Sequence, residues 1–217
     1  MKRIIYTIIV LLMSVGILLP NVVVAEPADE PDEIDTLITS MSNEEKIAMM
    51  IMPSFRRRTG IAINKGNIKE ILSTYEYAGV ILFGENTPDI ESTMRLVDLM
   101  QEANKDHHTR LLVAIDQEGG YVARLGVGTT MPGNMALAAT GNPENAYQAG
   151  KAIGKELKML GINTNFAPVV DVNSNPNNPV IGVRSFSDDP NTVATYGEQF
   201  MKGLQSEGIV SSLKHTP

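Results

Sequence analysis

Helix and strand signals alternate along this chain from residue 42 onward, and no other feature restricts its fold as strongly. Four apolar runs have the length and continuity of strands that are buried on both faces, and a weaker run precedes them. They lie at residues 79–83, 111–115, 165–170 and 209–213, with the weaker run at 49–53. Strands that alternate with helices form parallel sheets through right-handed crossovers, so the pattern predicts an α/β fold.

Polar caps mark the predicted helix starts. Ser42 and Glu45 have the spacing of a capping box, in which each side chain bonds the backbone N–H of the other residue. Three further starts place a capping side chain directly before a proline, whose fixed φ and missing N–H suit the first turn of a helix. These starts are Thr87-Pro88, Asn142-Pro143 and Asp189-Pro190. Gly161 and Gly208 are expected to end the helices that follow the last two.

Hydrophobic periodicity does not distinguish a closed (β/α)₈ barrel from an open parallel sheet. Each predicted strand is followed by a polar loop that contains glycine or proline. A barrel places its active site in the loops at this end of its strands. The loops are therefore the place to look for functional side chains.

The first 25 residues have the features of a secretory signal peptide. Two basic residues and an apolar stretch at 4–19 precede Ala25, which ends a small-residue site suited to signal peptidase. Residues 22–24 extend the apolar stretch toward the roughly 20 residues that span a bilayer, so an uncleaved membrane anchor is the alternative. Pro20 interrupts the stretch and favours cleavage. We therefore expect export by a Sec-type signal, to the outside of the cell or to its surface.

Residues 26–35 carry six acidic residues and two prolines, a composition too charged to pack. We expect a disordered tether there and a folded domain over residues 36–217. The chain has no cysteine, which excludes a disulfide framework and a lipid anchor on cysteine. Its net charge of −7 argues against a nucleic-acid partner, and nothing in the sequence indicates a protein partner.

Acidic residues and glycines follow the strand predicted at residues 111–115. The segment 116–120 reads Asp-Gln-Glu-Gly-Gly. Carboxylates at this end of a barrel strand face the ligand, and Asp116 is able to accept hydrogen bonds from sugar hydroxyls. A solvated turn explains the same residues equally well.

The loop after the next predicted strand contains several oxygen-bearing side chains. Residues 171–175 space them like a calcium loop, but Pro176 and Gly182 stand where that loop needs glycine and glutamate, so we reject calcium. The asparagines are expected to hydrogen-bond the loop backbone. Arg184 presents a rigid set of donors in the same loop, with a surface ion pair as the alternative.

Lys214 and His215 follow the strand predicted at residues 209–213. Two such donors at a strand end suit a polar ligand, although a Lys-His pair taken alone is more often a solvated strand end. The other candidates are weaker. His107-His108 is expected in a solvated loop and Arg56–Arg58 in an exposed basic patch. Gly150–Lys155 imitates a phosphate-binding loop, but its glycines are one residue too close and lie inside a predicted helix.

Three segments together, residues 116–125, 165–186 and Lys214-His215, resemble the N-terminal barrel of glycoside hydrolase family 3, in its β-N-acetylhexosaminidase branch. Their order and spacing match, and the resemblance extends over residues 34–217. The block from Asn-Phe-Ala-Pro-Val-Val-Asp-Val-Asn to Gly-Val-Arg-Ser-Phe is far more specific than any single motif. The resemblance implies a (β/α)₈ TIM-type barrel, and the strand count predicts that about its first five strand–helix units are present.

The resemblance also implies a pocket that binds a terminal N-acetylglucosamine, in which an aspartate holds ring hydroxyls. The residues implied for this pocket are Asp116, Arg124, Arg184, Lys214 and His215. The nucleophilic aspartate and the general-acid histidine of this branch are expected after Pro217. No catalytic residue is therefore expected within the chain, and the 217-residue fragment is expected to be inactive alone.

The activity implied for the parent protein is retaining hydrolysis of terminal β-linked N-acetylglucosamine from cell-wall or chitin-derived saccharides, with no metal and no cofactor. Such hydrolysis needs a general acid and a nucleophile on opposite faces of the sugar. Two alternatives are a β-glucosidase or β-xylosidase of the same family and a non-catalytic sugar-binding remnant.

We predict that the mature chain begins at Glu26, because signal peptidase cleaves after the small-residue site that Ala25 ends. N-terminal sequencing of extracellular protein checks this start. Cytoplasmic protein that still begins at Met1 would contradict it.

Overall fold

The structure is a computed structural model that describes residues 32–55 and 65–215. The predicted signal peptide, most of the predicted tether and the basic patch at Arg56–Arg58 lie outside these ranges. Within the two ranges, no helix has both the length and the apolar character that crossing a bilayer requires.

The chain divides into two units, Met1–Ser40 and Met41–Pro217, and α2 (Glu33–Ser40) is the helix described in the first. The sequence assigned residues 33–35 to the tether, whereas the structure places them in the first turn of α2. Two of them, Glu33 and Asp35, are acidic. Negative side chains are favourable at the N-terminus of a helix, because they oppose its dipole.

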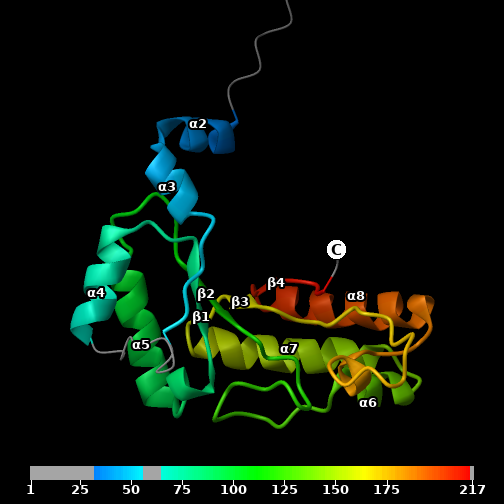
Figure 1. Cartoon of the computed structure of the whole chain (residues 1–217). Helices are drawn as coiled ribbons and strands as arrows, with labels where there is room; N and C mark the ends of the chain where they lie inside the picture. Colours follow the sequence, from blue (N-terminus) through cyan, green and yellow to red (C-terminus); the bar gives the residue numbers. More distant parts are fainter. Residues whose placement is uncertain (1–31, 56–64, 216–217) are drawn as a thin grey trace, which may run out of the picture. The chain divides into compact units, whose positions relative to one another are not determined.

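The second unit alternates helices and strands as the sequence pattern predicted (Figure 1). Two of its helices, α4 and α6, were not predicted. Its elements are α3 (Asn43–Ala48), α4 (Lys65–Thr74), β1 (Gly79–Leu82), η2 (Gly84–Asn86), α5 (Ile90–Ala103), β2 (Leu112–Ile115), α6 (Asn134–Ala139), α7 (Glu144–Met159), β3 (Thr164–Asn165), η3 (Gly182–Arg184), α8 (Pro190–Ser206) and β4 (Val210–Ser211).

The strands form one parallel sheet in the order β1-β2-β3-β4, so each strand pairs with its neighbour in sequence. A doubly wound open sheet reverses its strand order at one point, whereas a (β/α)₈ barrel adds strands in sequence order. The order thus confirms the α/β prediction and is consistent with an incomplete barrel.

The strands predicted at 79–83 and 111–115 are each one residue shorter than expected, whereas β3 and β4 have only two residues each. The weaker run at 49–53 is not assigned as a strand. Isolated parallel bridges lie next to these regions. One joins Ser54, which follows the weaker run, to Ile81 of β1. Another joins Val169 to Lys214, beyond the paired residues of β3 and β4. The sheet therefore continues in space beyond its regular ladders, because single bridges carry the pairing where the backbone departs from strand geometry.

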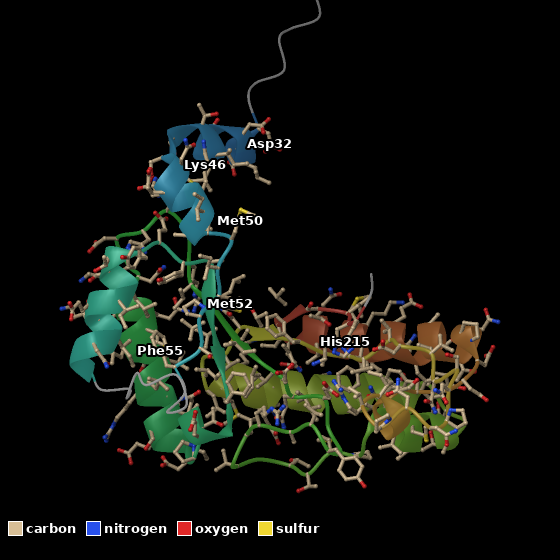
Figure 2. The ribbon with its side chains drawn as sticks, viewed as in Figure 1. Asp32, Lys46, Met50, Met52, Phe55 and His215 are labelled. Carbon is tan, nitrogen blue, oxygen red and sulfur yellow. The ribbon has the colours of Figure 1, made fainter. Side chains whose placement is uncertain are left out.

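The core lies between the sheet and the helices α4, α5, α7 and α8. Val80, Val113 and Ile115 of the strands are fully buried. Phe55, labelled in Figure 2, also lies in this core and is 2% exposed. Burial on both faces explains the continuous apolar runs in the sequence.

Two of the four predicted helix caps, Ser42 and Asp189, are formed as expected. Ser42 and Glu45 make both bonds of the capping box at the start of α3, and Asp189 accepts a hydrogen bond from Thr192 N–H at 2.8 Å, ahead of Pro190. Asn142 Oδ1 accepts one from Glu144 N–H at 3.2 Å, but the N-cap of α7 is Pro143, so this predicted start is displaced by one residue. These starts are local in sequence, which is why the pattern found them.

The prediction that Thr87 caps the next helix is wrong. Asp89 caps α5 instead, and its carboxylate accepts a hydrogen bond from Ser92 N–H at 2.8 Å. Thr87 is fully buried and its hydroxyl donates to the carbonyl oxygen of Arg124 at 2.8 Å. The Thr87 hydroxyl bonds a loop that is distant in sequence and is therefore not available to cap the helix.

Helices α7 and α8 pack against each other backbone to backbone. A Cβ atom on Gly150 would lie 2.2 Å from the carbonyl oxygen of Phe200, and one on Gly203 would lie 2.2 Å from that of Tyr147. Gly150 lies inside α7, which agrees with the earlier conclusion that residues 150–155 are helical and do not form a phosphate-binding loop. These glycines are needed because no side chain fits between the helices.

We predict that Gly203→Ala lowers the free energy of unfolding by about 1 kcal/mol, since overpacking typically costs 1–3 kcal/mol and the gain in helix propensity offsets roughly 1 kcal/mol. Urea unfolding followed by circular dichroism measures the change. Gly84→Ala is the control, because its new methyl group would meet the carbonyl oxygen of Arg124 at an ordinary 3.4 Å. Equal stability of Gly203→Ala and the unmodified protein would show that the helices separate at little cost.

Candidate functional site

The carboxyl ends of the parallel strands bring acidic and basic side chains together. Asp116 directly follows β2, and Lys214 lies just after β4. The Nζ atom of Lys214 is 2.6 Å from Oδ1 of Asp116 and 2.6 Å from Oε1 of Glu118. All three side chains are mostly buried, because the exposed fraction is 14% for Lys214, 19% for Asp116 and 2% for Glu118. The two loops meet because their strands lie in one sheet with the same direction.

Glu118 also binds Arg184 through two parallel hydrogen bonds. The Nε atom of Arg184 donates to Oε2 at 2.9 Å and Nη2 donates to Oε1 at 2.8 Å. The hydrogen bonds that Arg184 donates to Glu118 raise the pKa of the guanidinium, although desolvation opposes this effect. A forked pair of this kind fixes the orientation of the guanidinium plane.

Glu118 is a site residue that the sequence analysis did not name, and Asp171, described below, is another. Glu118 lies on the same loop as Asp116, two positions later, and side chains two apart in extended chain point to the same side. That spacing was the available signal. Its role as a shared acceptor depends on Lys214 and Arg184, which are far away in sequence, so the sequence alone did not indicate it.

His215 is positioned by Asp171, which lies on the loop that follows the Val169 bridge. Both its backbone N–H and its Nδ1 atom approach Oδ2 of Asp171, at 3.0 and 2.8 Å. The side chain of His215, labelled in Figure 2, is 48% exposed. Asp171 therefore orients the imidazole and leaves its other ring nitrogen for a ligand.

Arg124 is not joined to the other predicted site residues by any hydrogen bond that involves its side chain, within the described part of the chain. Its guanidinium carbon lies 6.0 Å from the ring centre of Phe83. Its Nε atom is buried and has no hydrogen-bond partner there. The backbone N–H of Arg124 donates to Oε1 of Gln117 at 2.7 Å, which holds this loop against the end of β2.

A buried asparagine supports the same loop from below. Asn165 in β3 is fully buried, accepts a hydrogen bond from Gln117 N–H at 2.9 Å and donates one to the carbonyl oxygen of Gln117 at 2.9 Å. The loop that carries Asp116 and Glu118 is thus tied to two strands of the sheet. Such ties hold binding side chains in one geometry before a ligand arrives.

The loop that carries Arg184 is held largely by its own polar groups. Asn175 Oδ1 accepts a hydrogen bond from Asn177 N–H at 3.0 Å, and Asn178 Oδ1 accepts one from Val180 N–H at 2.8 Å. This confirms the predicted backbone hydrogen bonds for Asn175 and Asn178, whereas the buried Oδ1 of Asn173 has no hydrogen-bond partner in the described part of the chain. Asn134 of α6 donates to the carbonyl oxygen of Arg184 at 2.7 Å and so connects the loop to a helix.

A cavity of about 530 Å³ opens beside the Glu118–Arg184 pair. Its lining also includes Tyr121, which is 85% exposed, and the buried Asn134. A cavity of this size, with a few polar groups among apolar ones, is typical of small-molecule sites.

Residues 42–217 match the glycosyl hydrolase family 3 N-terminal domain. The chain belongs to this family. The match begins at the capping box of α3 and covers every strand of the sheet. It confirms the resemblance on which the predicted site was based.

Several relatives are named for β-hexosaminidase activity. The chain is 44% identical to beta-hexosaminidase A of Pseudoalteromonas piscicida over 172 residues, which is 76% of this chain and 29% of that protein. It is 40% identical over 107 residues to the beta-N-acetylglucosaminidase/beta-glucosidase of Cellulomonas fimi, or 49% of this chain and 19% of that protein. The chain therefore spans less than a third of either relative.

Solved structures of the family share the fold. The family 3 beta-N-acetylglucosaminidase from Paenibacillus sp. str. FPU-7 superimposes with a TM-score of 0.75 at 36% identity, over 82% of this chain and 34% of that one. NagZ from Neisseria gonorrhoeae, in complex with N-trifluoroacetyl-D-glucosamine, does so with a TM-score of 0.67 at 31% identity, over 77% of this chain and 49% of that one. The fold of this chain is accordingly the TIM-barrel-like α/β fold of the family.

We predict that Glu118→Gln lowers the free energy of unfolding by about 3 kcal/mol, because it leaves the charges of Arg184 and Lys214 without their buried partner. Urea unfolding measures the loss. Glu91→Gln is the matched control, since its pair with Arg95 is exposed (67% for Arg95 and 73% for Glu91) and such pairs contribute less than about 1 kcal/mol. Equal losses in both variants would mean that the buried network contributes no more than a surface ion pair.

Proposed function

We propose that the protein carrying this chain is a retaining exo-glycosidase that releases terminal β-linked N-acetylglucosamine from cell-wall or chitin-derived saccharides. The observation that supports this most directly is the network of Asp116, Lys214, Glu118 and Arg184 at the carboxyl ends of the strands. A barrel enzyme places its substrate at this end. The relatives named for β-hexosaminidase activity support the choice of sugar.

In this proposal the described residues bind the sugar, and other residues break the bond. The free acceptor sites of the Asp116 carboxylate take hydrogen bonds from ring hydroxyls, while Lys214 holds that carboxylate in place. Arg184 and the half-exposed imidazole of His215 supply donors to the sugar. The resemblance assigns the nucleophilic aspartate and the general-acid histidine to the part of the family sequence after the Lys-His motif.

The reaction would proceed through two steps at the anomeric carbon. The nucleophilic carboxylate attacks while the acid protonates the leaving oxygen, and water then hydrolyses the glycosyl-enzyme intermediate. Binding residues such as Asp116 contribute by holding the ring so that both groups reach opposite faces of that carbon. This chemistry requires neither a metal ion nor a cofactor.

A β-glucosidase is the second candidate, because the Cellulomonas fimi relative is named for both activities. The two are separated by comparing the full-length protein on the 4-nitrophenyl β-glycosides of N-acetylglucosamine, glucose and xylose. Faster release from the N-acetylglucosaminide supports the hexosaminidase. We also propose that the protein acts outside the cytoplasm, which rests on the signal-like residues 1–25.

We predict that Asp116→Ala lowers kcat/KM of the full-length enzyme at least ~100-fold, because the sugar hydroxyl would lose a charged acceptor in a partly buried site. The rate of 4-nitrophenol release from the N-acetylglucosaminide measures it, with circular dichroism to show that the variant folds. Asp98→Ala is the control, since Asp98 is exposed on α5. Unchanged kinetics in a folded Asp116→Ala variant would remove Asp116 from the site.

A further inference from the structure

Three side chains that can bind a metal ion meet near the amino-terminal ends of the strands, whereas Asp116 lies at their carboxyl ends. Glu45 belongs to α3, Glu76 to the loop that leads into β1, and His108 to the loop that leads into β2. Loops that precede the strands lie at the amino-terminal face of a barrel, away from its active site. This cluster therefore belongs to a different part of the molecule from the proposed sugar site.

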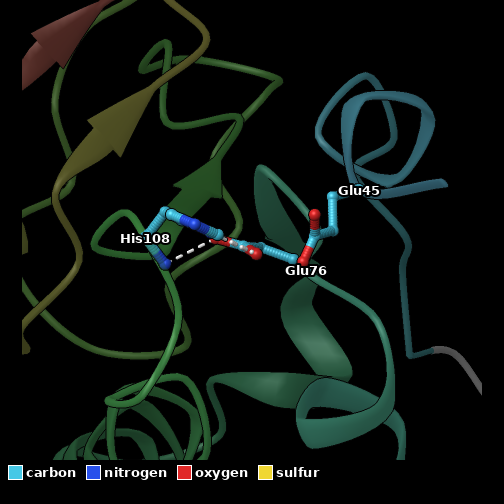
Figure 3. Close-up of side chains that lie close together, drawn as sticks. All are labelled: Glu45, Glu76 and His108. Atoms are coloured by element: carbon cyan, nitrogen blue, oxygen red, sulfur yellow. Dashed lines mark hydrogen bonds and ion pairs between the residues drawn. The ribbon is translucent and has the colours of Figure 1, made fainter. Parts of the chain in front are cut away.

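His108 lies in an exposed loop, as the sequence analysis expected, but its contacts with Glu76 were not anticipated. Its backbone N–H donates to Oε1 of Glu76 at 2.5 Å, and its Nδ1 atom lies 2.9 Å from each oxygen of that carboxylate. Figure 3 shows the imidazole pointing toward Glu76 while Glu45 approaches from α3. The partner comes from a loop distant in sequence, so the His-His pattern gave no signal of it.

The spacing of these groups fits the coordination shell of a metal ion. Ligand atoms from all three residues lie within 4.8 Å of one another. Ligands about 2.1 Å from a metal ion lie roughly 3.0 Å apart at a right angle and roughly 3.4 Å apart at the tetrahedral angle. The 2.9 Å separation between His108 Nδ1 and the Glu76 oxygens is close to such an edge.

Charge and burial also favour a bound cation. The side chain of Glu76 is only 7% exposed, and the carboxylate of Glu45 adds a second negative charge beside it. Glu45 also accepts a hydrogen bond from Ser42 N–H at 2.7 Å, which holds its carboxylate in place and leaves further acceptor sites free.

We infer that Glu45, Glu76 and His108 form a binding site for a divalent transition-metal ion, with Zn²⁺ as the best match. One imidazole and two carboxylates suit Zn²⁺ better than Mg²⁺, which prefers oxygen ligands and water. Water takes the remaining position, because His108 is 34% exposed at its side chain. The ion joins α3 to the loops before β1 and β2 and stabilises that end of the fold, with no part in hydrolysis.

A salt bridge between Glu76 and His108 is the competing explanation, and Glu45 distinguishes the two. The salt bridge needs no contribution from Glu45, whereas the metal site needs all three side chains. Glu45→Gln is a useful variant because glutamine also fits the capping box and preserves the start of α3. Glu44→Gln, one position earlier on the same exposed turn, changes the helix charge equally and is the matched control.

The experiment uses the full-length protein after chelation and dialysis. Isothermal calorimetry with ZnCl₂ and the Tm with and without Zn²⁺ are measured at pH 7.5. We expect Zn²⁺ to bind and to raise the Tm. His108→Gln and Glu76→Gln should abolish this binding, and Glu45→Gln should weaken it at least about tenfold. Glu44→Gln and His107→Gln should bind as the unmodified protein does.

Zinc bound elsewhere is separated from this site by comparing variants. The chain has three histidines and no cysteine, so alternative zinc ligands within it are few. Circular dichroism confirms that each variant folds, and His108→Gln, which replaces a partly exposed side chain, stands in if Glu76→Gln does not fold. Unchanged Zn²⁺ binding in His108→Gln or in Glu45→Gln overturns the inference, as does the absence of Zn²⁺ binding to the unmodified protein.

Discussion

The carboxylate of Glu118 is almost fully buried and is shared by two cations, Arg184 and Lys214, that reach it from other loops. Burial of one such charge costs several kcal/mol unless good partners surround it. The loops after β2 and β4 and the segment at η3 must therefore keep their positions together. The geometry of the proposed sugar site depends on this requirement, because Asp116 is held by the same lysine.

The two ends of the parallel strands carry side chains that suit different ligands. At the carboxyl-terminal edge, Asp116 and His215 keep unused hydrogen-bonding capacity next to buried partners. At the other edge, Glu76 and His108 face each other and a further carboxylate, an arrangement suited to an ion rather than to a sugar. This division agrees with the general pattern of barrels, in which one face binds substrate and the other contributes to stability.

Family membership and local geometry support the proposed function in different ways. The family match establishes which fold the chain adopts and which relatives it has. The structure adds how the side chains are held, including Asp171 behind His215 and Asn165 beneath the loop that carries Asp116. Because the chain spans less than a third of its relative from Pseudoalteromonas piscicida, the activity concerns the protein as a whole.

Several features could be predicted from the sequence because they depend on residues close together in the chain. Apolar runs located β1 and β2, the Ser42–Glu45 box and Asp189-Pro190 located helix starts, and Gly161 and Gly208 adopt the positive φ expected after a helix. Family motifs added Asp116, Arg184, Lys214 and His215, which the structure brings to one edge of the sheet.

The tertiary structure alone decided which distant groups meet. Thr87 bonds a distant loop instead of capping a helix. Glu118 forms ion pairs with two distant cations, and His108 pairs with Glu76. Local patterns follow from hydrogen bonds within a few residues, whereas these pairs form only when the sheet and its helices have packed and desolvated the groups involved.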